Sequence, residues 1–251
     1  MKARSSKKIN KKNNIILGVN IDHAATLRQI RGATTVYPDL LELTDIVKKG
    51  GGKQITIHLR EDRRHIQDSD VILLCKKSKL KINLEMAISD EMLKIALKNN
   101  PAWVCFVPEK REELTTEGGL NIIQTFEKIK QMTEILKKNK IKVSYFIEPN
   151  MAQVSAAKLA GADAVEFHTG HWVTAKAPKK EMIWSKLYEC ATKTHELGMR
   201  VHAGHGLDFH HAKLIKNLPY LKEVNIGHSL ICYSLEYGLK KSIQKMIEKL
   251  K

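Results

Sequence analysis

The sequence has few cysteines and prolines, and it has no long apolar run. Its four cysteines are widely spaced without a Cys-x-x-Cys pair, which argues against a zinc site and against a disulfide framework. A reducing, cytoplasmic location is the simplest inference from this cysteine usage. No segment reaches the roughly 20 apolar residues of a membrane span. Residues 1–14 lack the apolar centre of a secretory signal, and we expect them to form a disordered basic tail.

Aromatic residues are also scarce, at 6% of the chain, although the formal net charge is +16. Such a charge fits nucleic-acid binding, attraction of phosphorylated metabolites, or a lysine-rich solvated surface. The chain has no segment in which basic and aromatic residues alternate as in RNA-binding motifs. We therefore expect no nucleic-acid partner and no membrane partner.

Segments with strand character alternate with segments of helical spacing along the rest of the chain. The expected strands are residues 15–23, 55–60, 81–87, 103–107, 142–148, 164–170, 200–206 and 223–229. This alternation indicates an α/β protein with a parallel sheet. Eight such units fit a (β/α)8 TIM barrel with extra helices, formed as one catalytic domain by residues 15–251. A doubly wound open sheet is the alternative, but its central strands are usually continuous apolar runs.

Several connections carry more specific expectations. The segment after the first strand, with Arg28 and Arg31, is expected to be a polar loop, and residues 171–180 a long connection. Asp68, Ser89 and Asn150 are expected to cap helices. One helix is expected after residue 229, and His210 and His211 are expected at the surface of a short helix.

Polar side chains recur near the carboxyl ends of the expected strands and share one face of each strand. They are Asp22, His58, Glu85, Glu166, His168 and His205. In a barrel this face points into the lumen, close to the end where active sites form. Carboxylates and imidazoles from different strands offer general acids and bases on opposite sides of a bound substrate.

Other residue types indicate anion binding at the same end. Gly204, Gly206 and Gly227 allow backbone N–H groups to approach a ligand closely, and the loops after the last two strands are the usual phosphate site of this fold. Arg60 and His65, together with Arg31, offer a second set of donors for an anion.

A metal site is an open alternative at this point, and it would use His168, His202 and His205. The chain has no helical His-x-x-x-His pair with a nearby carboxylate. We therefore expect no metal ion. His168 and His202 are equally compatible with plain packing in the lumen, and His23 and His228 are expected to contact a ligand.

Eight short motifs make the chain recognisable. They are GVNIDHAATLR at 18–28, HLREDRRH at 58–65, NLEMA at 83–87, VPEKR at 107–111, TTEGG at 115–119, EFHTG at 166–170, AGHGL at 203–207 and NIGH at 225–228. In this order they resemble the pyridoxine 5′-phosphate synthase family of vitamin B6 biosynthesis. The resemblance runs from about residue 15 to the last helix.

The resemblance implies a reaction and a role for each matching residue. The family condenses 1-deoxy-D-xylulose 5-phosphate with 3-amino-2-oxopropyl phosphate and releases inorganic phosphate and water, with no cofactor and no metal. By motif, His58 and Glu85 are proton acceptors, His205 is the proton donor and Glu166 stabilises transition states. The deoxyxylulose phosphate is held by Asp22, His23, Arg60, His65 and Thr115. The amino-ketone phosphate is held by Asn20, Arg31, Gly206, Gly227 and His228. A homo-octamer built from dimers is also implied.

The chain departs from the family pattern at two places, and two other functions stay open. His202 stands where we expect Asn, and His171-Trp172 follows Gly170 where other residues are usual. Another phosphate-binding barrel enzyme, an aldolase or isomerase, is the alternative, although no strand interior carries a central lysine for a Schiff base. A basic nucleic-acid binder is the third possibility, and it would leave the carboxylates at the strand ends unexplained.

Overall fold

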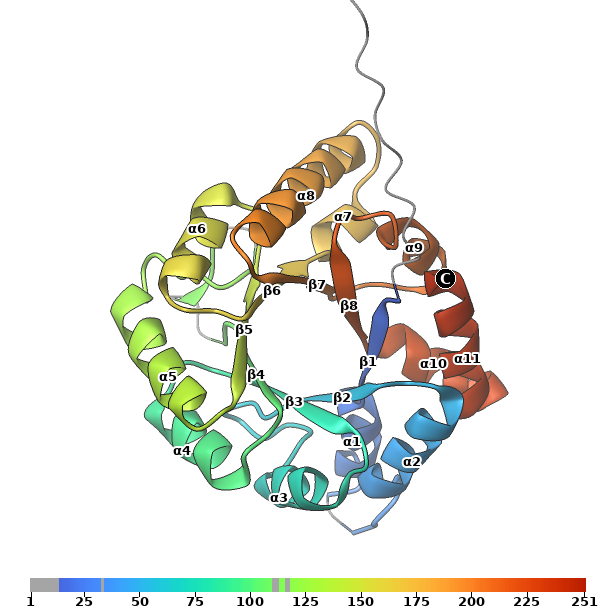
Figure 1. The fold of residues 1–251 in the computed structure, drawn as a ribbon. Helices are drawn as coiled ribbons and strands as arrows, with labels where there is room; N and C mark the ends of the chain where they lie inside the picture. Colours follow the sequence, from blue (N-terminus) through green and yellow to red (C-terminus); the bar gives the residue numbers. More distant parts are fainter. Residues whose placement is uncertain (1–13, 33, 110–112, 116–117) are drawn as a thin grey trace, which may run out of the picture.

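The computed structural model describes residues 14–32, 34–109, 113–115 and 118–251. Eight parallel strands close into a barrel in chain order, with β8 bonded to β1, and the helices lie outside the ring (Figure 1). The strands are β1 (Ile16–Asn20), β2 (Gln54–His58), β3 (Lys81–Met86), β4 (Trp103–Phe106), β5 (Lys142–Ile147), β6 (Ala164–His168), β7 (Arg200–Gly204) and β8 (Leu221–Ile226). The predicted (β/α)8 barrel is confirmed, and the open sheet is excluded.

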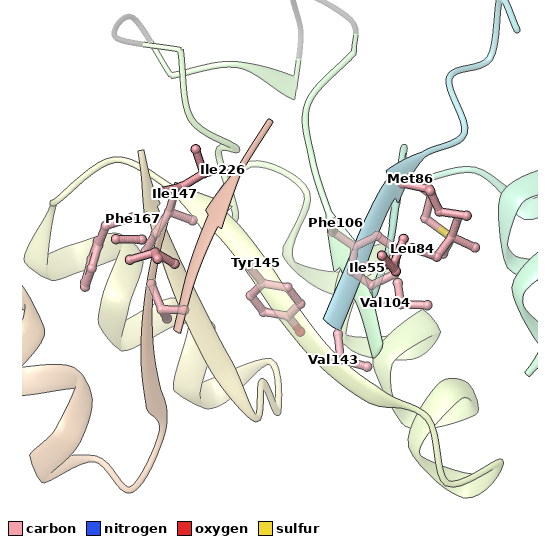
Figure 2. Close-up of a cluster of buried hydrophobic side chains, with 14 of the residues drawn as sticks. Ile55, Leu84, Met86, Val104, Phe106, Val143, Tyr145, Ile147, Phe167 and Ile226 are labelled. Carbon is pink, nitrogen blue, oxygen red and sulfur yellow. The ribbon is translucent and has the colours of Figure 1, made fainter. Parts of the chain in front are cut away.

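Side-chain alternation along β2 explains why the strands form two environments. Ile55 and Ile57 are fully buried in the apolar core. Their neighbours in the sequence point the other way: Thr56 Oγ1 donates to Asn225 Oδ1 on β8 at 2.9 Å. Figure 2 shows part of the apolar set, including Leu84, Val104 and Phe167. The polar side chains of the strands line the lumen. Because side chains point alternately to the two faces of a strand, this alternation places reactive groups inside the barrel.

Eleven helices lie within the described residues. They are α1 (Asp22–Gln29), α2 (Leu40–Gly50), α3 (Asp68–Lys77), α4 (Asp90–Asn99), α5 (Phe126–Lys138), α6 (Met151–Leu159), α7 (Gly170–Thr174), α8 (Lys179–Glu196), α9 (Phe209–Ile215), α10 (His228–Tyr237) and α11 (Leu239–Leu250). Two predicted caps are confirmed: Ser89 accepts from the Met92 amide, and Asn150 from the amides of Ala152 and Gln153. These bonds satisfy amides that a helix leaves without partners. The third was wrong, because Asp68 is the first residue of α3 and Gln67 is its cap residue.

Three expectations about the connections were wrong. The segment after β1 is not a loop, because Ala24 and Ala25 bury one face of α1 against the barrel. The connection after β6 contains the short helix α7. The last helical segment is two helices, because Gly238 takes a positive φ of 80° between α10 and α11, a conformation that glycine adopts easily.

His211 is a further correction, since it is 8% exposed instead of lying at the surface. Its Nδ1 lies 2.8 Å from Asp208 Oδ1. Its ring meets the Trp172 ring edge to face, with the two ring centroids 5.3 Å apart. The pairing satisfies one ring nitrogen, and this is what allows a histidine to be buried.

Two expectations from the sequence stay predictions. The predicted basic tail lies outside the described residues except for Asn14, and the assignment of residues 15–251 to a single domain stays a prediction. Within the described part of the chain, every helix is too short or too polar to cross a bilayer.

Candidate active site

A cavity of about 860 Å³ opens at the carboxyl ends of the strands. Its lining includes, from the predicted set, Asn20, Asp22, His23, His58, Arg60, His65, Glu85, Glu166, His205, Gly206, Gly227 and His228. Two predicted residues are not part of the lining. Arg31 is exposed in the turn after α1. Thr115 is half-buried, and its Oγ1 has no hydrogen-bond partner among the described residues.

Asp22 fixes the start of the cavity wall at the end of β1. Its Oδ1 accepts from the backbone N–H of His58 at 2.9 Å, and its Oδ2 accepts from Asn20 Nδ2 at 2.8 Å. Burial raises the pKa of Asp22 to about 6, against the opposing effect of the nearby His58. The carboxylate therefore links β1 to β2 and is still able to take up a proton close to neutral pH.

Glu109 orients the imidazole of His58. His58 Nε2 lies 2.8 Å from Glu109 Oε1, and the other Glu109 oxygen accepts from the Glu61 amide at 3.0 Å. Burial opposes ionisation, but the bonds from His58 and Glu61 outweigh it and lower the pKa of Glu109. An anionic Glu109 favours the proton on Nε2, which leaves Nδ1 as the acceptor nitrogen.

Glu85 lies beside that acceptor nitrogen because β2 and β3 pair His58 with Glu85 in register. His58 Nδ1 is 4.0 Å from Glu85 Oε2. Burial raises the pKa of Glu85 well above its ordinary value, and the carboxylates of Glu166 and Asp22 add to the effect. Once ionised, such a carboxylate is a stronger base than a solvated one.

Arg60 and His65 supply donors to the same wall. Arg60 Nε is buried without a hydrogen-bond partner in the described part of the chain, and it lies 3.5 Å from Asp62 Oδ1. His65 Nδ1 accepts from the Ile66 amide at 2.8 Å, which makes Nε2 the donor nitrogen. Burial, with the positive charges of His58 and Arg60, lowers the pKa of His65 to about 4. A guanidinium and a neutral N–H donor suit one anion.

Glu166 forms the floor of the cavity on the opposite side. Asn225 Nδ2 donates to Glu166 Oε2 at 2.7 Å, deep in the lumen. Burial raises the pKa of Glu166 to about 8, so the carboxyl group is mostly protonated at pH 7. A Cβ at Gly204 would lie 2.1 Å from Glu166 Oε1. The glycine therefore leaves the space that the carboxyl group occupies.

His205 lines the same cavity, next to a second histidine. The rings of His168 and His205 meet edge to face with their centroids 4.8 Å apart, and His168 Nδ1 forms a short hydrogen bond with Glu148 Oε1. Desolvation at the cavity wall lowers the pKa of His205, and the charges of His168 and His171 act in the same direction. His205 is therefore mostly neutral at pH 7.

His23 and His228 close the remaining part of the rim. Their rings lie edge to face at 5.0 Å, and desolvation followed by the charge of His228 lowers the pKa of His23. His228 is the first residue of α10, and Gly227 precedes it as the cap residue. The first amides of a helix point outward and favour an anion, so the rim has donors for a phosphate here as well.

Among the residues that the structure describes, two groups of side chains have the donor types of a metal site, with their ligand atoms within 4.8 Å of one another. They are Asp22–His58–Glu85 and Glu148–His168–His171. Imidazole and carboxylate donors in this number suit Zn²⁺. The alternative trio weighed from the sequence is not one of these groups, because His202 is buried beside Glu223, with Nδ1 3.6 Å from Glu223 Oε1. The expected absence of a metal stays a prediction.

Comparison with known proteins identifies the family. The model of the family described as pyridoxal phosphate biosynthesis protein PdxJ matches residues 17–251. The chain belongs to this family.

Named relatives support this assignment, and solved structures match the fold alone. The pyridoxine 5′-phosphate synthase of Bdellovibrio bacteriovorus is 56% identical over 96% of this chain and all of its own length (100%). That of Photobacterium profundum is 50% identical over 93% of this chain and 96% of its own. Phosphoribosylanthranilate isomerase from Thermotoga maritima shares only the fold, with 10% identity, a TM-score of 0.58, and coverage of 94% of this chain and 98% of its own.

The PdxJ-family site also contains residues to which sequence reasoning gave no role. Glu109 lies in the VPEKR motif and Asn225 in the NIGH motif. Neither residue was expected from the sequence to take part in the site. Asn225 shares the lumen face of β8, which was a usable signal. Glu109 follows β4 in irregular chain, where no periodicity predicts the direction of a side chain.

Proposed function

We propose that the chain makes pyridoxine 5′-phosphate by condensing 1-deoxy-D-xylulose 5-phosphate with 3-amino-2-oxopropyl phosphate, with release of phosphate and water. The supporting observation is that acids, bases and anion donors at the ends of β1, β2, β3, β6, β7 and β8 meet in one cavity. Membership of the PdxJ family and the names of its relatives support the same reaction. The substrates are small phosphorylated molecules.

Two groups of donors suit the two substrates. The wall with Asp22, Arg60 and His65 is assigned to the deoxyxylulose phosphate, together with His23 and Thr115. The rim with Gly206, Gly227 and His228 is assigned to the amino-ketone phosphate, together with Asn20 and Arg31. The buried Arg60 Nε and the start of α10 support these assignments, since both offer donors for an anion.

Proton transfers are divided between the two sides of the cavity. Imine formation joins the amine to a ketone and expels its oxygen as water, and phosphate loss and ring closure need further proton removal and delivery. His58 Nδ1 and Glu85 are assigned as the proton acceptors. Glu166, with a pKa of about 8, is assigned to donate a hydrogen bond where negative charge develops.

His205 is assigned as the proton donor. Because its pKa is lowered, the ring is mostly neutral before the reaction. It takes up a proton released at one step and delivers that proton at a later step, so its charge returns to the starting state. This proton cycling needs no metal and no redox cofactor in the proposed reaction.

The deciding experiment mixes the purified protein with both phosphates and follows pyridoxine 5′-phosphate and inorganic phosphate. Equal amounts of the two products are expected, and neither product is expected when one substrate is omitted. Consumption of the deoxyxylulose phosphate without the amino ketone would instead favour an aldolase or isomerase. No product from the complete mixture would contradict the proposal.

We also propose a cytoplasmic homo-oligomer, an octamer by resemblance. Exposed apolar side chains near α1, including Leu27, Ile30 and Tyr37, are compatible with a covered face. Arg31 lies outside the cavity of a single chain, so its assigned role requires either movement of its turn or contact with a neighbouring copy. Light scattering of the purified protein measures the assembly, and a monomer would contradict this part.

A further inference from the structure

His205 has a backbone conformation that side chains rarely adopt. Its φ is 71°, and Gly206 follows with a φ of 77°. Glycine accepts such angles without cost, but a histidine does not, and residues in this conformation persist only where their surroundings hold them. Something beside β7 must therefore hold His205 in place.

Thr169 provides that contact from the end of β6. Its side chain is fully buried. Its Oγ1 lies 2.8 Å from the carbonyl oxygen of Gly204 and 2.7 Å from that of His205, so one hydroxyl proton is shared between two consecutive carbonyls. The Thr169 amide also donates to the Gly204 carbonyl at 2.9 Å. These bonds fix the direction of both carbonyls and so the turn at His205.

Gly170 brings the chain directly against the imidazole. A Cβ at this position would lie 2.9 Å from His205 Cδ2 and 2.7 Å from His168 Nε2. The ring of His205 therefore has a wall of backbone on one side and the His168 ring on another. Thr169 sets the backbone from which the ring projects, and Gly170 limits where the ring can go.

We propose that Thr169 is a positioning residue whose hydroxyl group holds His205 at the angle that its proton transfers require. The proposal rests on the proposed function for its kinetic consequence, but the geometric part stands without it. The competing view is that Thr169 only closes the end of β6 and contributes to stability alone.

The kinetic test compares Thr169→Val, which keeps the shape but removes the donor, with Thr169→Ser, which keeps the donor. A misplacement of about 1 Å in a reacting group costs about 100-fold in rate, so kcat of the Val variant should fall by about that factor. The KM values for both substrates should change by less than about threefold, because substrate contacts are kept. The Ser variant should recover most of kcat. A Val variant as fast as the wild-type protein would overturn the proposal.

A second measurement uses the free protein and does not depend on turnover. Ring nitrogens of ¹⁵N-labelled histidine report the pKa of His205 by NMR, with Thr169→Val and wild type titrated in parallel. Once released, the ring should meet more water and move away from His168, and both changes should raise its pKa towards the ordinary value. An unchanged pKa of His205 would overturn the proposal. If the wild-type protein forms no product, the proposed function fails while this titration still decides the role of Thr169.

A double variant separates positioning from a general loss of structure. In a His205→Ala background, Thr169→Val should cost less than about threefold in kcat, because the group it acts through is absent. A full further loss would show that Thr169 acts elsewhere and would overturn the proposal. Circular dichroism and thermal unfolding check the fold of each variant. Should the Val variant not fold, Thr169→Ala removes the same hydroxyl from a smaller side chain, and the same outcomes apply.

Discussion

The two sides of the cavity use opposite electrostatics. On the β1–β3 side, Arg60 and Glu109 lie close together, and hydrogen bonds from His58 and the Glu61 amide keep Glu109 ionised. On the β6–β8 side, burial makes the protonated form of Glu166 and the neutral form of His205 dominant. Arg60 and Glu109 thus carry fixed charges, whereas Glu166 and His205, like Asp22 and Glu85 on the first side, can change their charge during a reaction. The difference teaches that burial alone does not set the state of a carboxyl group; the nearby donors decide it.

The largest expected effect concerns Glu85, the assigned base on β3. Glu85→Gln keeps the size of the side chain but removes its ability to accept a proton. General base catalysis contributes about 10²–10⁴-fold, so kcat should fall by that amount. Thermal unfolding should show that the fold survives. A near-normal turnover rate would remove Glu85 from its assigned role.

The next largest effect is expected when the negative charge of Glu109 is removed. Glu109→Gln leaves a hydrogen-bond partner for His58 Nε2 but removes the anion that favours the proton there. Loss of such an orienting partner costs about 10–100-fold in metal-site systems, and a fall in kcat of that order is expected here. Steady-state kinetics at several pH values measure it. No change in kcat would mean that Glu109 does not set the tautomer of His58.

A smaller and more selective effect is expected for the anion site. Arg60→Ala should raise KM for the deoxyxylulose phosphate by about tenfold or more, because a hydrogen bond to a charged group contributes about 1.5–3 kcal/mol. KM for the amino-ketone phosphate should change much less, and it serves as the internal control. Equal losses for both substrates would contradict the assignment of two separate sites.

The smallest effect is on thermal stability, and it concerns the protonated carboxyl group of Glu166. The pKa of Glu166 rises from 4.5 to about 8 in the folded protein. The fold therefore binds this proton more tightly than the unfolded chain does, so its stabilising contribution is complete below about pH 4.5 and is lost as the pH rises through about 8. Glu166→Gln should flatten this decline and raise Tm at pH 9 by about 5 °C relative to wild type. Parallel pH dependences for the two proteins would show that Glu166 is not held neutral.

The sequence predicted site residues at the ends of strands better than those in loops. Asp22, His58, Glu85, Glu166 and His205 were found because parallel strands end at one rim and the period of two tells which face a side chain takes. Glu109 was missed since its direction depends on a loop. Thr169 was missed since its bonds join residues 35 and 36 positions apart. Local pattern predicts faces of regular elements, but it does not predict long-range hydrogen bonds from irregular chain.

The helix α1 was mistaken for a loop for a related reason. It spans 8 residues. Its charged residues weaken the hydrophobic pattern, so that the two alanines that pack against the barrel do not stand out in the sequence. Arg28 is held there by Asp70, with Nη2 2.6 Å from Oδ2. This ion pair joins two segments 42 positions apart, and only the closed barrel brings them together.

The space that Gly204 leaves for Glu166 has a consequence for how this sequence can vary. A Cβ at position 204 would occupy the volume that the carboxyl group at position 166 now fills, so a larger residue at 204 alone creates a collision and a shorter side chain at 166 alone leaves a void. Laboratory evolution of this protein can therefore explore new side chains in the barrel floor only through paired exchanges on two adjacent strands, and saturation of position 204 alone should yield glycine almost exclusively.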